Sequence, residues 1–127
     1  MSRPFIFIGT HRLKEGKLGD FERAWKDLVD TVESKEPQMI SFNAYANEDG
    51  TEVAVVQVHP DAASMELHMA VVREHITQAY EELLEGTTSI QVFGELSEAA
   101  RGMMQHLAGS GVALTVKPNL LGGFIRI

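Results

Sequence analysis

Two histidines, His68 and His75, stand seven residues apart in the stretch HPDAASMELHMAVVREHITQAYEELL. Apolar residues recur there at helical spacing, which predicts one long helix from about His59 to Leu84. At about 100° per residue, His68, Val72, His75 and Ala79 fall along one shoulder of the apolar stripe. Both imidazoles therefore border a buried face. Because histidine titrates near neutral pH, His68 is our candidate base, and His75 is a candidate second polar contact or haem ligand.

Four further side chains are candidates for contact with a small molecule. His11 lies on the first predicted strand, two residues after Gly9, where the lack of a side chain would let a ligand approach the backbone. Asn43 and Tyr45 share one face of the second predicted strand, and Trp25 belongs to the apolar stripe of the first helix. For each of these residues the alternative is an ordinary packing or strand role.

Other chemistries find little support in the sequence. The chain has no cysteine, so disulfides, thiolate nucleophiles and cysteine-based metal sites are excluded. His68 and His75 are two helical turns apart, too far to hold one ion as histidines four residues apart do, and we predict no metal site. Phosphate-binding glycine loops and nucleophile elbows are absent, which disfavours phosphoryl transfer and serine-type hydrolysis.

The composition predicts one soluble domain. The chain has 127 residues, 44% of them apolar, and a formal net charge of −7. An acidic chain without a basic run argues against binding to nucleic acid or to an anionic membrane. No apolar run approaches the roughly 18 residues of a spanning helix, and no cleavage site follows the short run PFIFIG. We therefore expect a cytoplasmic protein.

The hydrophobic periodicity predicts the order strand, helix, strand, strand, helix, strand. Alternating segments at 4–13, 39–46, 52–59 and 87–95 read as strands, and the segment from about Leu18 to Ser34 reads as an amphipathic helix. Asp61 is the expected N-cap of the long helix, with Ser64 as a competing cap, and Gly86 is its expected end. Gly50 provides the positive φ of the turn between the middle strands.

This order is that of a ferredoxin-like βαββαβ fold of the α+β class, with two helices on one face of an antiparallel sheet. We assign residues 1–96 to that domain. Residues 97–127 form an extension that packs on the same domain or on a dimer partner. It comprises a methionine-rich helix at 97–107, capped by Ser97 and interrupted by Gly102, and strand-like arms at 112–116 and 124–127.

Several predicted strands are apolar on both faces, which predicts a homodimer. Phe5 and Phe7 alternate with Ile6 and Ile8. Helices cover only one face of the sheet in this topology. Each large apolar side chain left exposed on the other face loses roughly 1.5–3 kcal/mol of the stabilisation that burial would provide. The same sheet from a second copy is the simplest cover. The alternative is a monomer whose extension folds back over its own sheet.

The opening strand with LKEGKLGDFERAW, the pair Glu36–Pro37 and the segment DAASMELHM resemble the antibiotic biosynthesis monooxygenase-like (ABM) domains of the dimeric α+β barrel group. The resemblance covers roughly Phe5 to Glu95, and the tail TVKPNLLGGFIRI resembles that of a longer actinobacterial-type subgroup. It implies the fold more than a reaction, because members include cofactor-free polyketide oxygenases, quinol oxygenases, haem-degrading oxygenases and proteins of unassigned activity. The haem-degrading branch has a strand Asn and a Trp before the second helix, where this chain has neither.

The leading functional hypothesis is oxidation of a small aromatic or quinol-type compound without a cofactor. His68 would be the catalytic base, with His11, Asn43, Tyr45, His75 and Trp25 around the substrate. A non-catalytic ligand-binding protein on the same scaffold is the first alternative. Haem binding through His68 or His75 is the second.

Overall fold

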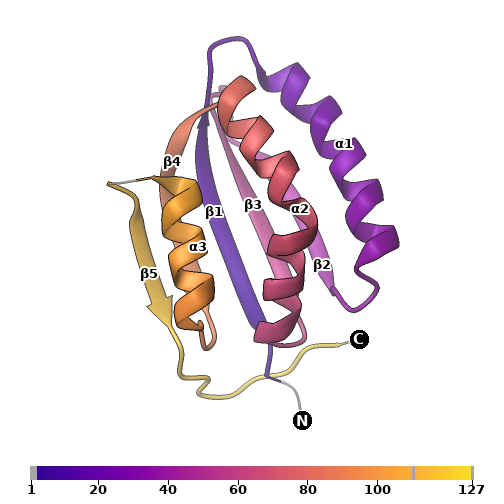
Figure 1. The fold of residues 1–127 in the computed structure, drawn as a ribbon, viewed down its shortest axis with the longest axis vertical. Helices are drawn as coiled ribbons and strands as arrows, with labels where there is room; N and C mark the ends of the chain where they lie inside the picture. Colours follow the sequence, from indigo (N-terminus) through magenta and orange to yellow (C-terminus); the bar gives the residue numbers. More distant parts are fainter. Residues whose placement is uncertain (1–2, 110, 127) are drawn as a thin grey trace.

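The computed structural model of the chain describes residues 3–109 and 111–126. Figure 1 shows a single sheet with one layer of helices in front of it. The elements, in chain order, are β1 (Phe5–Leu13), α1 (Leu18–Lys35), β2 (Ser41–Ala46), β3 (Glu52–His59), α2 (Ala62–Glu82), β4 (Leu84–Phe93), α3 (Glu98–Ala108) and β5 (Ala113–Lys117).

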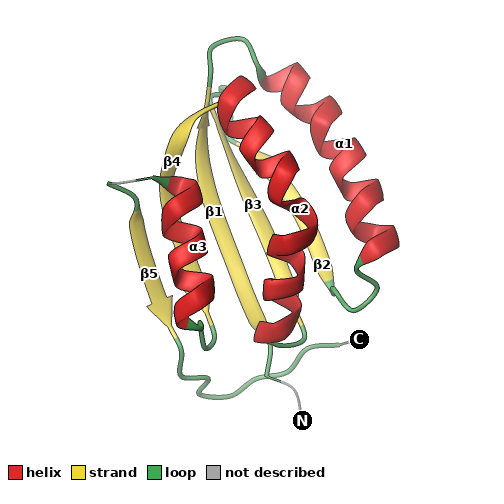
Figure 2. Cartoon of the chain, in the orientation of Figure 1, coloured by secondary structure: helices red, strands yellow, loops and turns green. Residues whose placement is uncertain are grey.

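The sheet has the strand order β2-β3-β1-β4-β5. The first four strands pair antiparallel, and β5 pairs parallel to β4 (Figure 2). This confirms the predicted ferredoxin-like α+β fold. The extension adds a third helix and a fifth strand to the same sheet, so the described residues form one packed unit.

The sequence predicted the N-terminal end of α2 correctly but not its C-terminal end. The Asp61 carboxylate accepts a hydrogen bond from the Ser64 backbone N–H at 2.9 Å, which confirms the predicted N-cap. The helix ends at Glu82, and Gly86 lies within β4 opposite Arg12. The prediction that Gly86 ends the helix is therefore wrong. The long β1 pairs with β4 as far as Leu13, and this pairing starts β4 earlier than the sequence predicted.

The extension also differs in detail from its predicted form. The Ser97 hydroxyl accepts from the Ala100 N–H, so Ser97 caps α3 as predicted. Gly102 does not interrupt that helix, which is continuous. The first predicted arm is β5, whereas 124–126 has no regular structure and Ile127 lies outside the described residues.

The two faces of the sheet differ in burial. Side chains that point toward the helices form the core, and Phe5, Val53 and Val92 are nearly inaccessible. The intervening residues Ile6 and Val58, which pair with each other, are only partly buried. One apolar face of the sheet is thus left without a covering layer in the single chain.

Candidate functional site

A cavity of about 120 Å³ lies between α2 and the sheet, and α1 and α3 contribute to its walls. Its lining is mostly apolar. Five aromatic side chains, Phe7, Phe21, Trp25, Phe42 and Tyr80, contribute to it, and three methionines, Met65, Met69 and Met104, add flexible surface. The Trp25 and Phe42 rings stack at 4.4 Å between centroids. The arrangement is that of a site for a small, flat, largely apolar molecule.

The predicted shoulder of α2 borders this cavity. His68, Val72, His75 and Ala79 all line it. His68 is 2% exposed, whereas His75 is exposed to solvent at the cavity margin. The four residues that the helical periodicity placed on one shoulder thus all face the cavity, together with Met65, Met69, Ile76 and Tyr80 of the same helix.

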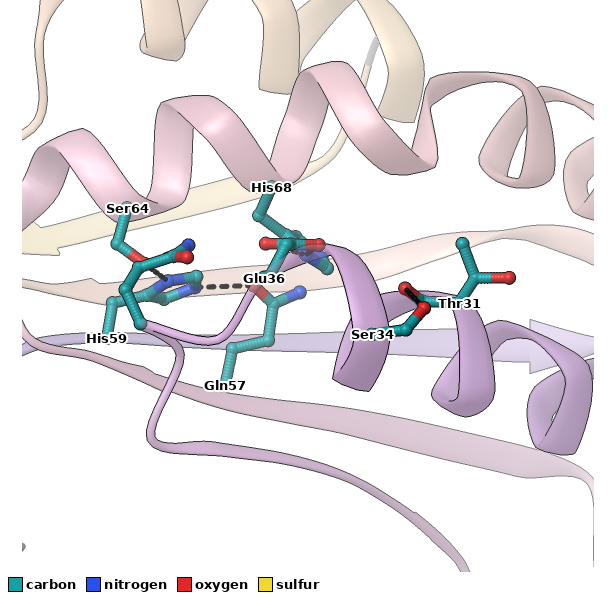
Figure 3. Close-up of polar contacts among 8 residues, drawn as sticks. Thr31, Ser34, Glu36, Gln57, His59, Ser64 and His68 are labelled. Carbon is teal, nitrogen blue, oxygen red and sulfur yellow. Dashed lines mark hydrogen bonds and ion pairs between the residues drawn. The ribbon is translucent and has the colours of Figure 1, made fainter.

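His68 is hydrogen-bonded to Glu36, which follows the last residue of α1. The carboxylate oxygens of Glu36 lie 2.9 and 3.1 Å from Nδ1 of His68, and the Glu36 side chain is fully buried. Figure 3 shows the carboxyl group next to the ring. Burial raises the pKa of Glu36 to about 7 and lowers the pKa of His68 to about 4. Both shifts favour the uncharged form of each group.

The second ring nitrogen of His68 is the one available to a ligand. Every fully enclosed side-chain nitrogen or oxygen atom in the described residues has a hydrogen-bond partner. Nδ1 bonds to Glu36, and Nε2 has no hydrogen-bond partner among the residues that the structure describes. Nε2 is therefore not fully enclosed. Because His68 lines the cavity, we assign Nε2 to the cavity side.

A second buried histidine supports this arrangement from β3. His59 is 0% exposed, and its Nδ1 lies 2.7 Å from the Ser64 hydroxyl, while its Nε2 lies 3.0 Å from the Gln57 side-chain oxygen (Figure 3). Gln38 donates to the same Ser64 hydroxyl at 3.2 Å. Burial, and then the neighbouring His68, lower the pKa of His59 to about 4. Ser64, the competing cap in the sequence, thus bonds to His59.

A further polar group borders the cavity near the C-terminal end of α2. His11 Nδ1 lies 2.8 Å from the Thr87 hydroxyl, and the Tyr80 hydroxyl bonds to the same oxygen. His11 and Tyr80 line the cavity, and burial lowers the pKa of His11 to about 4 and raises that of Tyr80. Tyr80 lies twelve residues after His68, about 18 Å along the helix axis. The cavity thus has two separate polar regions.

The space beside Gly9 is filled by the side chains of Phe7 and His11 and not left open to a ligand. A Cβ at Gly9 would lie 3.0 Å from the Phe7 ring and 3.1 Å from His11 Nε2. The two rings occupy the space that the missing side chain leaves. The expectation of a ligand approaching the backbone at Gly9 is therefore wrong.

The other predicted contacts divide between the two sides of the sheet. Trp25 is partly buried and lines the cavity. Asn43 and Tyr45 are exposed on the opposite, uncovered face, where they pair with Val56 and Ala54. The structure therefore separates Asn43 and Tyr45 from the cavity. The alternation along β2 correctly placed Asn43 and Tyr45 on the same face of the sheet. The helices cover the other face, which holds Phe42.

Glu36 and Thr87 were missed by the sequence reasoning. In the sequence, Glu36 stands out only in the pair Glu36–Pro37 that contributes to the family resemblance, and Thr87 only as the first residue of a predicted strand. No local pattern links Glu36 to His68, which is 32 residues away, or Thr87 to His11, which is 76 residues away. A charged residue directly before a helix-ending proline was the one available signal for Glu36.

Within residues 3–109 and 111–126, no group of three or more His, Asp or Glu side chains could hold a metal ion. In the same residues, no helix has both the length and the apolar character to cross a bilayer.

The fold and the cavity define a ferredoxin-like α+β protein with a mostly apolar site beneath its second helix. The sequence profile of the antibiotic biosynthesis monooxygenase family matches residues 4–82, more than half of the chain. The chain belongs to that family. Among curated proteins, no sequence matches it closely enough to count as a relative.

Solved structures show the same fold at low identity. MupZ from Pseudomonas fluorescens is 20% identical with a TM-score of 0.72, and the match covers 99% of this chain and 91% of MupZ. Protein SO0527 from Shewanella oneidensis is 20% identical with a TM-score of 0.62, covering 72% and 90%. PA3566 from Pseudomonas aeruginosa is 22% identical with a TM-score of 0.61, covering 76% and 98%. The likeness to MupZ extends over the C-terminal extension.

Proposed function

We propose that this protein is a monooxygenase that oxidises a small hydroquinone-type aromatic compound with O₂ and without a bound cofactor. The family supports the reaction class. The observation that carries the proposal is His68 in the wall of a cavity otherwise lined largely by apolar groups, with Nδ1 bonded to Glu36 and Nε2 assigned to the cavity side. A phenol deprotonated there becomes an electron-rich anion in a site with little water.

The cavity suits a ligand about the size of one aromatic ring. An apolar cavity of about 150 Å³ holds benzene, and this cavity measures about 120 Å³. The Phe42 ring lies 5.1 Å from the His68 ring and also stacks on Trp25. A flat ring beside His68 would therefore meet aromatic faces. The size does not favour a haem macrocycle.

The chemistry balances without another reactant. His68 Nε2 accepts a phenolic proton, and the resulting anion transfers electrons to O₂. One oxygen atom forms a new bond to the ring, and the other leaves as water together with two hydrogens of the substrate. The product is a hydroxyquinone, and the aromatic compound supplies all the electrons that O₂ accepts.

The other polar residues of the cavity would meet only a substituent of the ring or an entering substrate, because Tyr80 lies about 18 Å from His68 along the helix axis. His11 and Tyr80 offer polar groups at the far end of the cavity, and His75 stands at its margin. Because burial keeps His11 uncharged, it would act as a hydrogen-bond partner and not as a cation. Asn43 and Tyr45 would act only through the uncovered face of the sheet.

That uncovered face supports a homodimer as the working form. Ile6, Ile8, Val56 and Val58 form an apolar patch across β1 and β3 and are only partly buried in the single chain. A second copy related by a two-fold axis would cover it. Asn43 and Tyr45 would then lie at the interface between the two chains.

The test is oxygen uptake with a panel of substituted hydroquinones, in the presence of a chelator. We expect uptake by the wild type and a loss of about 10²–10⁴-fold in His68→Gln, the range typical of a general base. Glutamine removes the base but keeps a side chain that can bond to Glu36. His106→Ala, an exposed histidine of α3, is the matched control.

Two results would overturn the proposal. Saturable binding of hydroquinones without oxygen uptake would leave a non-catalytic ligand-binding protein. Uptake that persists unchanged in His68→Gln would remove His68 from the reaction.

A further inference from the structure

Glu36 lies between two hollows of the molecule. On one side its hydrogen-bond partner His68 lines the cavity. On the other side Glu36 borders a groove of about 220 Å³, lined also by Glu33, Pro37 and Ile40. Phe42 lines both hollows. The Glu36 side chain is itself fully buried, so its hydrogen bond to His68 lies between the cavity and this groove without opening into the groove.

No cation accounts for a buried carboxyl group at this position. Neither a lysine nor an arginine forms an ion pair with Glu36 within the described residues. Both carboxyl oxygens instead lie within 3.1 Å of one atom, Nδ1 of His68. A hydrogen bond of this kind needs one proton between the two groups, on either Glu36 or Nδ1.

The position of that proton decides what His68 offers the cavity. If Glu36 is a carboxylate, Nδ1 carries the proton and donates to it, and neutral His68 has a bare Nε2. If Glu36 is a carboxylic acid, its O–H donates to Nδ1, and Nε2 carries the ring proton. In the first state the cavity meets a base, and in the second it meets a hydrogen-bond donor.

We propose that Glu36 is a positioning residue that sets the tautomer of His68 and holds the Nδ1 proton while Nε2 carries the proton taken from the substrate. This inference rests on the proposed function, in which bare Nε2 accepts a phenolic proton. As Nε2 takes that proton, Nδ1 releases its own to the Glu36 carboxylate. When the reduced oxygen leaves as water it takes the proton from Nε2, and Glu36 returns its proton to Nδ1, which restores the starting state.

The surroundings place this switch near neutral pH. The titratable groups near the pair are Glu33 on α1, which lines the same groove, His68 on α2, and His59 on β3, whose ring lies 5.7 Å from that of His68. Burial disfavours charge on Glu36 and raises its pKa to about 7. His59 is uncharged at that pH and adds no positive charge. The base form of the site therefore predominates above about pH 7.

The test is nitrogen-15 NMR of the histidine rings in the full chain, without substrate, from pH 5 to 9. In the wild type we expect Nε2 of His68 to change from the protonated to the bare form with a midpoint near pH 7, while the ring stays uncharged. The His68→Gln spectrum identifies the signals. His59, bonded to Ser64 and Gln57, is the internal control and should keep one tautomer.

Glu36→Gln should abolish the transition, because an amide does not titrate in this range. A wild-type His68 that keeps one tautomer from pH 5 to 9 overturns the inference, as does the same transition in Glu36→Gln. If that variant fails to fold, the wild-type titration decides alone. The NMR result is independent of turnover, so a correct switch without oxygen uptake would refute the proposed function and leave the role of Glu36 intact.

Discussion

The ring centroids of His59 and His68 lie 5.7 Å apart, although the two imidazoles come from different elements and both are almost fully buried. Neither ring has a bulk-water shell that would stabilise a positive charge, and burial raises the pKa of the Glu36 carboxyl group beside His68 to about 7, so that group is largely uncharged at lower pH. Two adjacent buried imidazoles disfavour protonation through burial and through mutual repulsion, and this has a direct consequence for stability.

We predict that the protein loses stability as the pH falls from about 6.5 to 4. His11, His59 and His68 have pKa values lowered to about 4 in the folded chain, so the unfolded chain binds more protons in this range. Glu36 has its pKa raised to about 7 and binds its proton more tightly in the folded chain. Its proton release on unfolding cancels the proton uptake of one of the three histidines. Unfolding therefore takes up about two protons in total. The free energy of unfolding then changes by at most about 3 kcal/mol per pH unit.

Urea unfolding at pH 8, 6 and 4.5 measures this dependence. We expect the transition midpoint to fall toward acid pH, and His59→Gln to show a smaller decrease. A midpoint that is constant or that rises on acidification would show that the buried histidines are protonated in the folded state.

Ser64→Ala should destabilise the fold by about 1–3 kcal/mol. The substitution leaves His59 Nδ1 and the Gln38 amide without their shared partner in a buried place. Ser34→Ala is the matched control, because the Ser34 hydroxyl donates to the Thr31 carbonyl at the exposed end of α1 (Figure 3) and should change stability by less than about 0.5 kcal/mol. Thermal unfolding compares the two variants, and equal effects would contradict a buried network.

Ala79→Leu should weaken the binding of aromatic ligands. Ala79 lines the cavity on α2 next to Tyr80, so a larger side chain there takes space from a substituent of the ring held beside His68. Trp25 is the only tryptophan and lines the same cavity, so quenching of its fluorescence reports binding. Ala70→Leu makes the same change on the exposed side of α2 and should bind as the wild type does. Equal affinity in both variants would place the ligand elsewhere.

Val56→Glu should convert a dimer into a monomer. Val56 lies in the uncovered apolar face, paired with Ile8 and Asn43. A charge at the centre of such an interface costs several kcal/mol when it is buried without a partner. Sedimentation at micromolar concentration compares this variant with Gln78→Glu, a change on the exposed side of α2. A wild-type monomer under these conditions would refute the dimer.

Local patterns in the sequence predicted a large part of this architecture. Helical spacing identified the shoulder of α2 with His68 and His75, and Asp61 identified where that helix begins. Strand alternation identified the two apolar faces of β1. Each of these features depends on residues within a few turns or strand positions of one another, so periodicity and capping chemistry are sufficient to predict them.

The tertiary structure decided what the site contains. Glu36 meets His68 only because the end of α1 packs beside α2, and Thr87 meets His11 only because β4 pairs with β1. Alternation placed Asn43 and Tyr45 together, but which face of β2 the helices cover depends on the packing of the whole layer. Hydrogen bonds between distant segments leave no periodic trace in a single sequence, because their partners are brought together by the fold and not by their spacing.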